Sequence, residues 1–335
     1  MHRSIVKCLA FALPLSIALL SLPVQGAGLG LPGPIPGTPF ERHIIEDDAG
    51  RRITYYLSRP KAAVAPLLLM VQGSGCVPVL EEHKGTTSST YFNVIPFAQE
   101  GRFSVMVVEK PFAVEKPAQG QPCSARFNTD FTAKSWLKAL QASLRDARKS
   151  PWVHARRTVV FGHSEGAVMA TMLAGSDASI TDVIAIGGSG TTQLYDFIVH
   201  AYRTCFNAPA CLADVENKAR AIARNPDSAN DFAWGHPFKR WNSFFRVDPS
   251  EELLRSKARV YIAFGTADKA VPALSQEIML AKLLAAGRDV TVRRVPDAEH
   301  SLRQPEAMDV ADLDREYRAA LAWFWQHNSP GNSND

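Results

Sequence analysis

The sequence of 335 residues has little net charge, because Lys and Arg number 37 against 33 for Asp and Glu, a formal excess of +4. So small an excess argues against nucleic acid as the main partner. The sequence has no metal-ligand cluster, phosphate-binding loop or dinucleotide fingerprint, and therefore predicts neither a metal nor another cofactor. At 46% hydrophobic and 21% charged residues, it also excludes disordered, collagen-like and multi-span membrane proteins.

Long hydrophobic runs are also scarce. The only candidate, residues 8–22, follows the basic residues Arg3 and Lys7 and is uncharged and mostly aliphatic. It is short of the roughly 20 residues that a spanning helix needs, and small residues follow at 24–27. This order predicts a cleaved signal peptide over residues 1–26. We therefore expect an exported protein, periplasmic or extracellular, with no membrane anchor after cleavage.

Cysteine is rare, with five residues in the whole chain. Removal of the signal peptide discards Cys8 and leaves Cys76, Cys123, Cys205 and Cys211. An even number of cysteines in an oxidising compartment predicts disulfide bonds, and three pairings are possible. The short spacing favours a local Cys205–Cys211 bond, which leaves Cys76 to pair with Cys123.

Short β-rich runs alternate with helical patterns along most of the chain. The later runs are apolar throughout, as in parallel strands that are covered on both faces. The expected strands are 40–45, 53–58, 66–71, 103–108, 158–162, 182–186, 260–264 and 290–295. Helical periodicity marks residues 133–147 and 310–324. The alternation predicts an α/β fold with a doubly wound, mostly parallel sheet.

One domain over residues 39–327 accounts for this pattern, with a Gly/Pro-rich linker at 27–38 before it and a flexible tail at 328–335 after it. A mostly helical insertion at about 191–250 interrupts the domain. Six aromatic residues fall within fourteen positions of this insertion. They predict either a helical lid over an apolar acyl or aryl group or the packing of the lid itself. The candidates for substrate contact are Trp234, His236 and Trp241.

The strongest local motif is a G-x-S-x-G pattern from Gly162 to Gly166, centred on Ser164. An apolar strand precedes it and a helical run follows it, which is the context of a nucleophile elbow. Residues 187–191 also place a serine among glycines after a strand, but Thr191 replaces the last glycine. We interpret that second segment as a loop.

A serine nucleophile needs a base, and the base needs an acid that orients it. In chain order the partners should follow as acid and then histidine. Asp268 follows the strand at 260–264, and His300 follows the strand at 290–295. The carboxyl ends of parallel strands meet at one edge of the sheet, where these residues can converge with Ser164. Asp297 is the alternative acid.

A tetrahedral intermediate also needs hydrogen-bond donors for its oxyanion. One is expected from the backbone N–H of Glu165, which follows the nucleophile at a helix N-terminus. The other should come from the Gly-rich loop at 72–75, with the N–H of Ser74 as first candidate and Gly75 as second. A Cys76–Cys123 bond would brace this loop.

Over about residues 40–190 and 255–327 the chain resembles the α/β-hydrolase superfamily, through its GHSEG, GTADKAVP, DAEHS and QGSG segments. In finer detail it looks like the dienelactone-hydrolase and prolyl-peptidase-like branch of bacterial esterases. The resemblance implies Ser164 as nucleophile, Asp268 as acid and His300 as base. The common His-Gly of the oxyanion loop is Gln72-Gly73 here, a departure from hormone-sensitive-lipase types.

The sequence therefore predicts an exported, carboxylesterase-like serine hydrolase. It would cleave carboxylic esters of a small-molecule acyl substrate through an acyl-enzyme on Ser164. The absence of a propeller-like gating domain favours esters over peptides. The alternatives are a serine peptidase or aminopeptidase of the same fold, and a catalytically inactive binding protein on a hydrolase scaffold.

Overall fold

The structure, a computed structural model, describes residues 33–90, 94–115, 119–120, 122–205, 209–304 and 310–327. The predicted signal peptide, the first half of the predicted linker (residues 27–32) and the predicted tail lie outside these residues. Among the described helices, none is long and apolar enough to cross a membrane.

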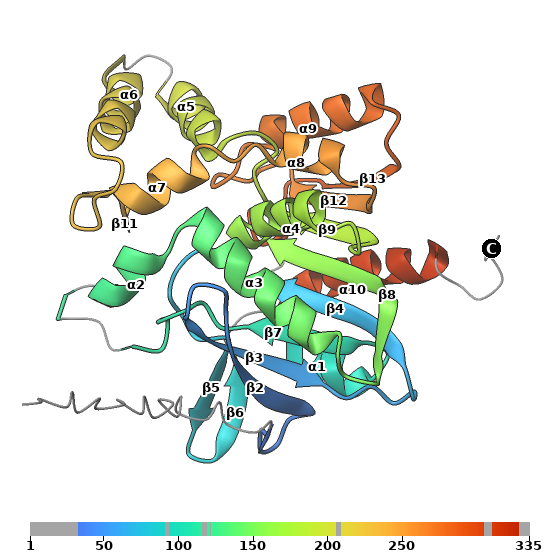
Figure 1. Ribbon diagram of the computed structural model, residues 1–335. Helices are drawn as coiled ribbons and strands as arrows, with labels where there is room; N and C mark the ends of the chain where they lie inside the picture. The colour runs from blue at the N-terminus through green and yellow to red at the C-terminus, as the bar shows by residue number, and fades with distance from the viewer. Residues whose placement is uncertain are drawn as a thin grey trace, which may run out of the picture.

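A single nine-stranded sheet forms the centre of the molecule (Figure 1). The first three strands pair antiparallel and the other six are parallel to one another. In spatial order the strands are β1 (Gly33–Pro34), β2 (Phe40–Glu46), β3 (Arg52–Ser58), β7 (Ser104–Val108), β4 (Ala65–Val71), β8 (Val153–His163), β9 (Asp182–Ile186), β12 (Arg259–Gly265) and β13 (Val290–Val295). The predicted doubly wound, mostly parallel sheet is confirmed.

All eight strands expected from the sequence are present. Strands β4, β7 and β9 are buried along their whole length, which explains their uninterrupted apolar sequences. The linker prediction is wrong at its end, because Gly33 and Pro34 pair with β2 as β1. The sequence also gave no sign of the hairpin of β5 (Leu80–His83) and β6 (Thr86–Ser89), whose strands are largely polar.

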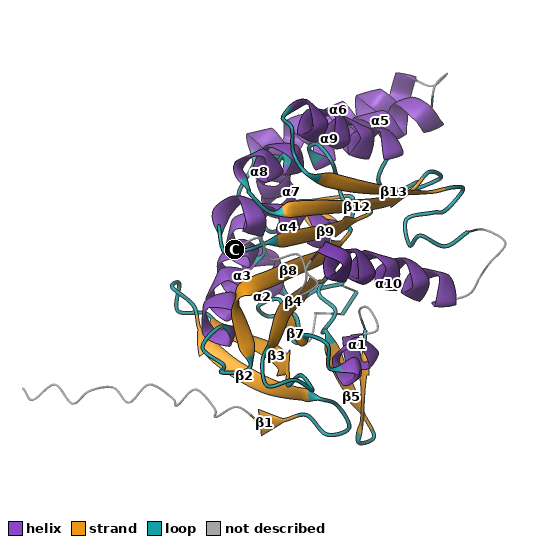
Figure 2. Cartoon of the chain, turned by 90° about the vertical axis from the view of Figure 1, so that its right-hand side faces the viewer, coloured by secondary structure: helices purple, strands orange, loops and turns teal. Residues whose placement is uncertain are grey.

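Helices cover both faces of the sheet (Figure 2). On one face pack α3 (Ala133–Ala147), α4 (Glu165–Ser176), α8 (Pro249–Arg255) and α9 (Ala273–Ala285), around a core that includes Trp136 and Leu173. On the other face pack α1 (Val94–Glu100) and α10 (Val310–His327), around a core that includes Phe161 and Phe324. This two-sided cover leaves the carboxyl ends of the parallel strands as the edge where loops can form a site.

The chain between β9 and β12 forms the predicted insertion. It contains α5 (Gln193–Thr204), α6 (Pro209–Arg224), the short hairpin of β10 (Phe232–Ala233) and β11 (His236–Pro237), and α7 (Phe238–Phe244), before α8. In Figure 1, α5, α6 and α7 lie together beside α2 (Ala125–Asp130) and α9. A disulfide between Cys205 and Cys211 joins the end of α5 to α6. We call residues 191–250 the inserted segment.

Candidate active site

Ser164 lies in the turn between β8 and α4, and this turn forces its backbone into an uncommon conformation with φ 58° and ψ −126°. Such a conformation costs a non-glycine residue about 1–3 kcal/mol. A Cβ on Gly162 would lie 2.1 Å from the carbonyl oxygen of Gly166, and a Cβ on Gly166 would lie 2.0 Å from that of Val71. No side chain fits at either position, so the G-x-S-x-G pattern is a steric requirement of the turn.

His300 connects Ser164 to Asp268. Its Nε2 lies 2.9 Å from the Ser164 Oγ, and its Nδ1 lies 2.8 Å from the Asp268 Oδ2. The other oxygen of Asp268 accepts from the backbone N–H groups of Ala270 and Val271, at 2.7 and 2.9 Å. Because an ionised carboxylate only accepts, Nδ1 of His300 carries a proton and Nε2 is free to accept the serine proton.

His163 fixes the loop that carries His300. Its Nε2 lies 2.9 Å from the His300 carbonyl oxygen, and because a carbonyl only accepts, this nitrogen donates. Burial, with the charge of His300 second, lowers the pKa of His163 to about 4, so its ring is neutral near pH 7. The alternative acid, Asp297, is exposed, and its backbone N–H donates to the hydroxyl of Thr266. The structure therefore brings Asp268, and not Asp297, to His300.

The predicted oxyanion donors lie on the side of Ser164 that is opposite His300. Glu165 is the first residue of α4, so its backbone N–H has no acceptor within the helix. Ser74, in the loop after β4, lines the same cavity as Ser164 and Glu165, whereas Gly75 is not part of the cavity wall. Gly75 has a φ of +100°, which a glycine adopts without strain. Of the two candidates in this loop, the structure thus places Ser74 at the cavity.

A buried lysine that the sequence analysis missed joins the two oxyanion segments. Lys110 follows β7, and its side chain is fully buried. Its ammonium donates to the carbonyl oxygens of Gly73 and Gly75, at 2.6 and 3.0 Å, and to the Glu165 carboxylate at 3.2 Å. These three bonds use all the donors of the ammonium group. A single side chain therefore holds the 72–75 loop against the start of α4.

Arg240 of α7 binds the other oxygen of the Glu165 carboxylate. Burial alone would raise the pKa of Glu165, but the charges and hydrogen bonds of Arg240 and Lys110 outweigh it and lower this pKa to about 2. Glu165 is therefore ionised near neutral pH. We call Lys110, Glu165 and Arg240 the buried charge cluster; it connects the inserted segment to the residue after the nucleophile.

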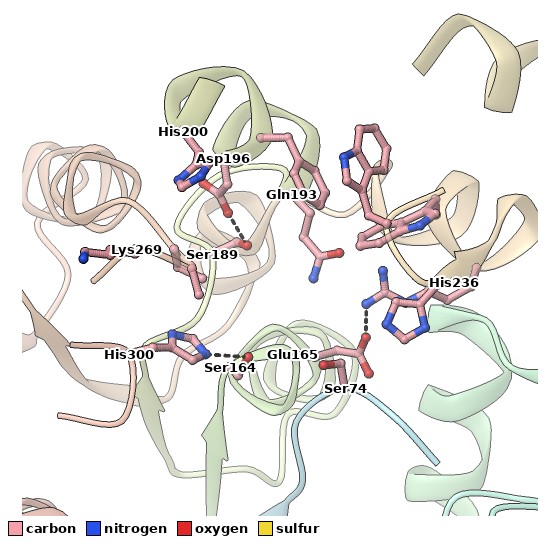
Figure 3. A pocket seen from close by; sticks show the side chains of 16 residues that line it. Ser74, Ser164, Glu165, Ser189, Gln193, Asp196, His200, His236, Lys269 and His300 are labelled. Carbon is pink, nitrogen blue, oxygen red and sulfur yellow. Dashed lines mark hydrogen bonds and ion pairs between the residues drawn. The ribbon is translucent and has the colours of Figure 1, made fainter. Parts of the chain in front are cut away.

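A cavity of about 360 Å³ opens above Ser164, between the sheet edge and the inserted segment (Figure 3). Its volume falls at the lower end of the range for small-molecule sites. All three predicted contact residues, Trp234, His236 and Trp241, line it. Trp234 stacks on Phe197 with ring centroids 4.4 Å apart, so these aromatic residues pack against one another as well as facing the cavity. Within the described residues, no group of side chains is arranged to hold a metal ion.

The loop at 187–191 also reaches this cavity, a role that the sequence did not reveal. Ser189 lines the wall and donates to Asp196 of α5 at 2.5 Å (Figure 3). Burial, with the charge of Asp268 adding to it, raises the pKa of the Asp196 carboxyl to about 6. A buried carboxyl thus titrates in the cavity close to neutral pH.

The raised pKa of Asp196 predicts a pH dependence of stability. Between pH 4 and 6 the folded protein holds the Asp196 proton more tightly than the unfolded chain, so the contribution of Asp196 to the free energy of unfolding falls as pH rises and levels off above about pH 6. The pKa of Asp196 rises from 3.8 to about 6 on folding. This shift corresponds to a loss of up to about 3 kcal/mol in the free energy of unfolding. Asp196→Asn should remove this part of the pH dependence in urea unfolding, so the slope between pH 4 and 6 should change. Asp227→Asn, at an exposed position of the same segment, should keep it; an unchanged slope in Asp196→Asn contradicts the prediction.

Both predicted disulfides are present, and one of them lies beside the site. Cys76 directly follows the 72–75 loop and is bonded to Cys123, which precedes α2. This bond closes a loop with a sequence separation of 47, against 6 for Cys205–Cys211. Disulfides are typical of proteins outside the reducing cytoplasm.

The difference in loop length predicts unequal contributions to stability. By the chain-entropy relation, the Cys76–Cys123 bond contributes about 4 kcal/mol and the Cys205–Cys211 bond about 2 kcal/mol. We expect the double variant Cys76→Ala/Cys123→Ala to lower the free energy of unfolding more than Cys205→Ala/Cys211→Ala does, in urea titrations of each. An equal or reversed order would show that native-state strain, and not loop closure, sets the two values.

The comparisons with known proteins identify a family for this chain. The model of the alpha/beta hydrolase family matches residues 69–313, which include Ser164, Asp268 and His300. The chain belongs to the alpha/beta hydrolase family. The family match spans most of the sheet and the inserted segment. No curated protein matches the sequence.

Solved structures with the same fold include larger peptidases and one hydrolase of similar size. Acylaminoacyl peptidase from Pyrococcus horikoshii matches with a TM-score of 0.58 at 11% identity, over 87% of this chain and 42% of that protein. Dipeptidyl peptidase 4 from Porphyromonas gingivalis matches with a TM-score of 0.54 at 14% identity, over 86% of this chain and 35% of that protein. A putative dienelactone hydrolase from Klebsiella pneumoniae matches with a TM-score of 0.54 at 17% identity, over 85% of this chain and 97% of that protein. The chain thus spans less than half of each peptidase, and these similarities show the fold.

Proposed function

We propose that this member of the alpha/beta hydrolase family is an exported serine hydrolase that cleaves carboxylic esters of small molecules. The observation that carries the proposal is the pair of hydrogen bonds from Ser164 through His300 to Asp268, at the floor of a cavity. The two disulfide bonds support an extracytoplasmic location, periplasmic or extracellular, as the signal-peptide pattern does.

The geometry supports a two-step acyl transfer. His300 Nε2 takes the proton from Ser164 as the hydroxyl oxygen attacks the ester carbonyl, and Asp268 stabilises the imidazolium that forms. The oxyanion is bound by the backbone N–H of Glu165 and that of Ser74. His300 then protonates the leaving alcohol, and the same histidine activates a water that releases the acid from Ser164.

The size of the cavity supports a small ester over a polypeptide. A volume of about 360 Å³ admits a short acyl or aryl group, and the inserted segment covers the site on the side opposite the sheet. Peptide hydrolysis, the activity that the names of two structural neighbours state for those proteins, is the competing function.

A fluorophosphonate probe tests the proposal directly, because it labels a serine only when that serine is activated. We expect covalent labelling of Ser164 in the mature protein, located by peptide mass spectrometry. A panel of 4-nitrophenyl esters and aminoacyl 4-nitroanilides then separates the two hydrolytic functions. An unlabelled Ser164 would favour the inactive binding protein, and turnover of anilides alone would favour a peptidase.

A further inference from the structure

The guanidinium of Arg240 has hydrogen-bonding capacity that the protein does not use. Arg240 is only 3% exposed and lines the cavity above Ser164. Its Nη2 binds Glu165, but its Nε and Nη1 atoms are buried and have no hydrogen-bond partner in the structure. Buried N–H groups are normally paired, and an unpaired one costs about 1–3 kcal/mol, more when the group is charged. An unpaired donor at the wall of an active-site cavity indicates a ligand that pairs with it.

The aromatic neighbours of Arg240 restrict how a ligand can reach it. The guanidinium carbon lies 3.9 Å from the ring centroid of Trp241 and 4.6 Å from that of Phe244. These contacts fix the side chain, as cation–π contacts do. A bound group is therefore expected to approach in the plane of the guanidinium, as an oxygen acceptor does.

The charges around Arg240 favour an anionic acceptor. The buried charge cluster contains two cations, Lys110 and Arg240, and one anion, Glu165. The other two partners of Lys110 are neutral carbonyl oxygens. His236 adds no charge near neutral pH, because burial lowers its pKa to about 4. One positive charge is left without a buried counter-charge, an arrangement that is costly until an anion binds.

Asp196 and Lys269, the other charged groups at the cavity, do not alter this balance. Asp196 lies on the far side of the cavity from Glu165, where it accepts from Ser189 (Figure 3). Lys269 is exposed at the rim, so its charge is solvated. The unbalanced positive charge thus belongs to the wall formed by α7.

The position of His300 determines which part of a substrate contacts the cavity wall formed by α7. His300 must protonate the leaving alcohol, so the leaving group lies on its side of Ser164. Glu165 and His236 lie on the opposite side of Ser164 from His300 (Figure 3). The acyl group therefore extends toward Glu165, Arg240 and the tryptophans.

We propose that the substrate is a monoester of a dicarboxylic acid, whose free carboxylate accepts a hydrogen bond from Nη1 of Arg240 while its ester carbonyl lies over Ser164. The proposal rests on the proposed function for its ester bond. It adds a recognition site for the acyl end, on the inserted segment.

Matched substrates test this proposal. Mono-4-nitrophenyl esters of glutaric, adipic and pimelic acid are compared with the same esters methylated at the free carboxylate, after subtraction of uncatalysed hydrolysis. We expect at least one free acid to exceed its methylated partner by about 10-fold to 100-fold in kcat/KM, the value of one charge-assisted hydrogen bond. No preference at any chain length overturns the proposal.

Variants test whether Arg240 causes the preference for the free acid over the methylated ester. Arg240→Gln leaves Lys110 and Glu165 as a balanced pair, and it should lower kcat/KM for the free acid by a larger factor than kcat/KM for the methylated ester, so that the ratio between the two substrates falls. Arg240→Lys, which keeps the charge, should retain part of the preference. Lys239→Gln is the control on the same helix, since Lys239 donates to the Thr129 carbonyl. Equal loss for both substrates in Arg240→Gln, or loss of the preference in Lys269→Gln instead, overturns the proposal.

A binding measurement separates this proposal from the ester-hydrolase function. The free dicarboxylates (glutarate, adipate and pimelate) are titrated into Ser164→Ala and into Ser164→Ala/Arg240→Gln by calorimetry. Tighter binding to the first variant, by about 10-fold or more, supports the carboxylate site even if no ester is turned over. Equal binding to both variants overturns it, whatever the ester assays show.

Discussion

Ser164→Ala is expected to lower the turnover of any ester substrate by about 10⁵-fold to 10⁶-fold, the scale of loss when a nucleophile of a serine triad is removed. The reason is geometric, because the Ser164 Oγ lies 2.9 Å from His300 Nε2. Without it, His300 and Asp268 have no oxygen to activate. The measurement is kcat for 4-nitrophenyl esters under single-turnover and steady-state conditions.

The same substitution should leave the fold almost unchanged. The Ser164 side chain makes no capping bond to α4, and alanine is no more strained than serine at a φ of 58°. We therefore expect circular dichroism and urea unfolding of the variant to match those of the wild type within about 1 kcal/mol. A large loss of stability would mean that the elbow depends on the hydroxyl, contrary to the geometry.

Ser189→Ala is the matched control for this prediction. Ser189 lines the same cavity and also follows a parallel strand, but its hydroxyl is bonded to Asp196 instead of an imidazole. It should keep both fluorophosphonate labelling and most of the ester turnover. If Ser189→Ala abolishes labelling while Ser164→Ala does not, the nucleophile has been assigned to the wrong loop.

The features that the sequence predicted well are those that local physics determines. A parallel strand buried on both faces must be apolar throughout, so β4, β7 and β9 could be found from their residues alone. The elbow could be found because the two glycines flanking Ser164 have no room for a Cβ. Asp268 and His300 could be placed because each follows a strand, and parallel strands end at the same edge.

The features that the sequence did not predict depend on contacts between distant segments. Lys239 and Arg240 are neighbours with the same charge, yet one donates to an exposed carbonyl and the other is buried against Glu165. Only the tertiary position of α7, which packs against α3 and α6 and brings Arg240 to Glu165, distinguishes them. Lys110 did offer a signal, since it is a charged residue two positions after the end of the apolar strand β7, at the edge where sites form. Glu165, at the start of α4, is already explained by the favourable interaction of an acidic residue with the helix dipole. The sequence therefore gave no reason to expect its two cationic partners.

The buried charge cluster predicts the largest effect on stability. Glu165→Gln removes the anion that Lys110 and Arg240 share and leaves two buried cations without an anionic partner. Removing one partner of a buried ion pair costs about 3–5 kcal/mol, and here the amide must also accept from two charged donors. We expect a loss of this size in the free energy of unfolding from urea titration, together with reduced ester turnover, because the 72–75 loop is no longer fixed to α4.

Lys110→Met and Arg240→Gln are the controls, because each removes one cation and leaves a balanced pair. All three side chains are buried. Glu165→Gln keeps the side-chain volume, whereas the two controls reduce it, so a larger loss of stability in Glu165→Gln cannot come from packing and reports the uncompensated charge. Each control should therefore lose less stability than Glu165→Gln. The double variant Glu165→Gln/Arg240→Gln has one buried cation in place of two, so it should be more stable than Glu165→Gln alone. A double variant that is less stable would show that hydrogen bonding to Arg240, and not charge balance, holds the inserted segment on the site.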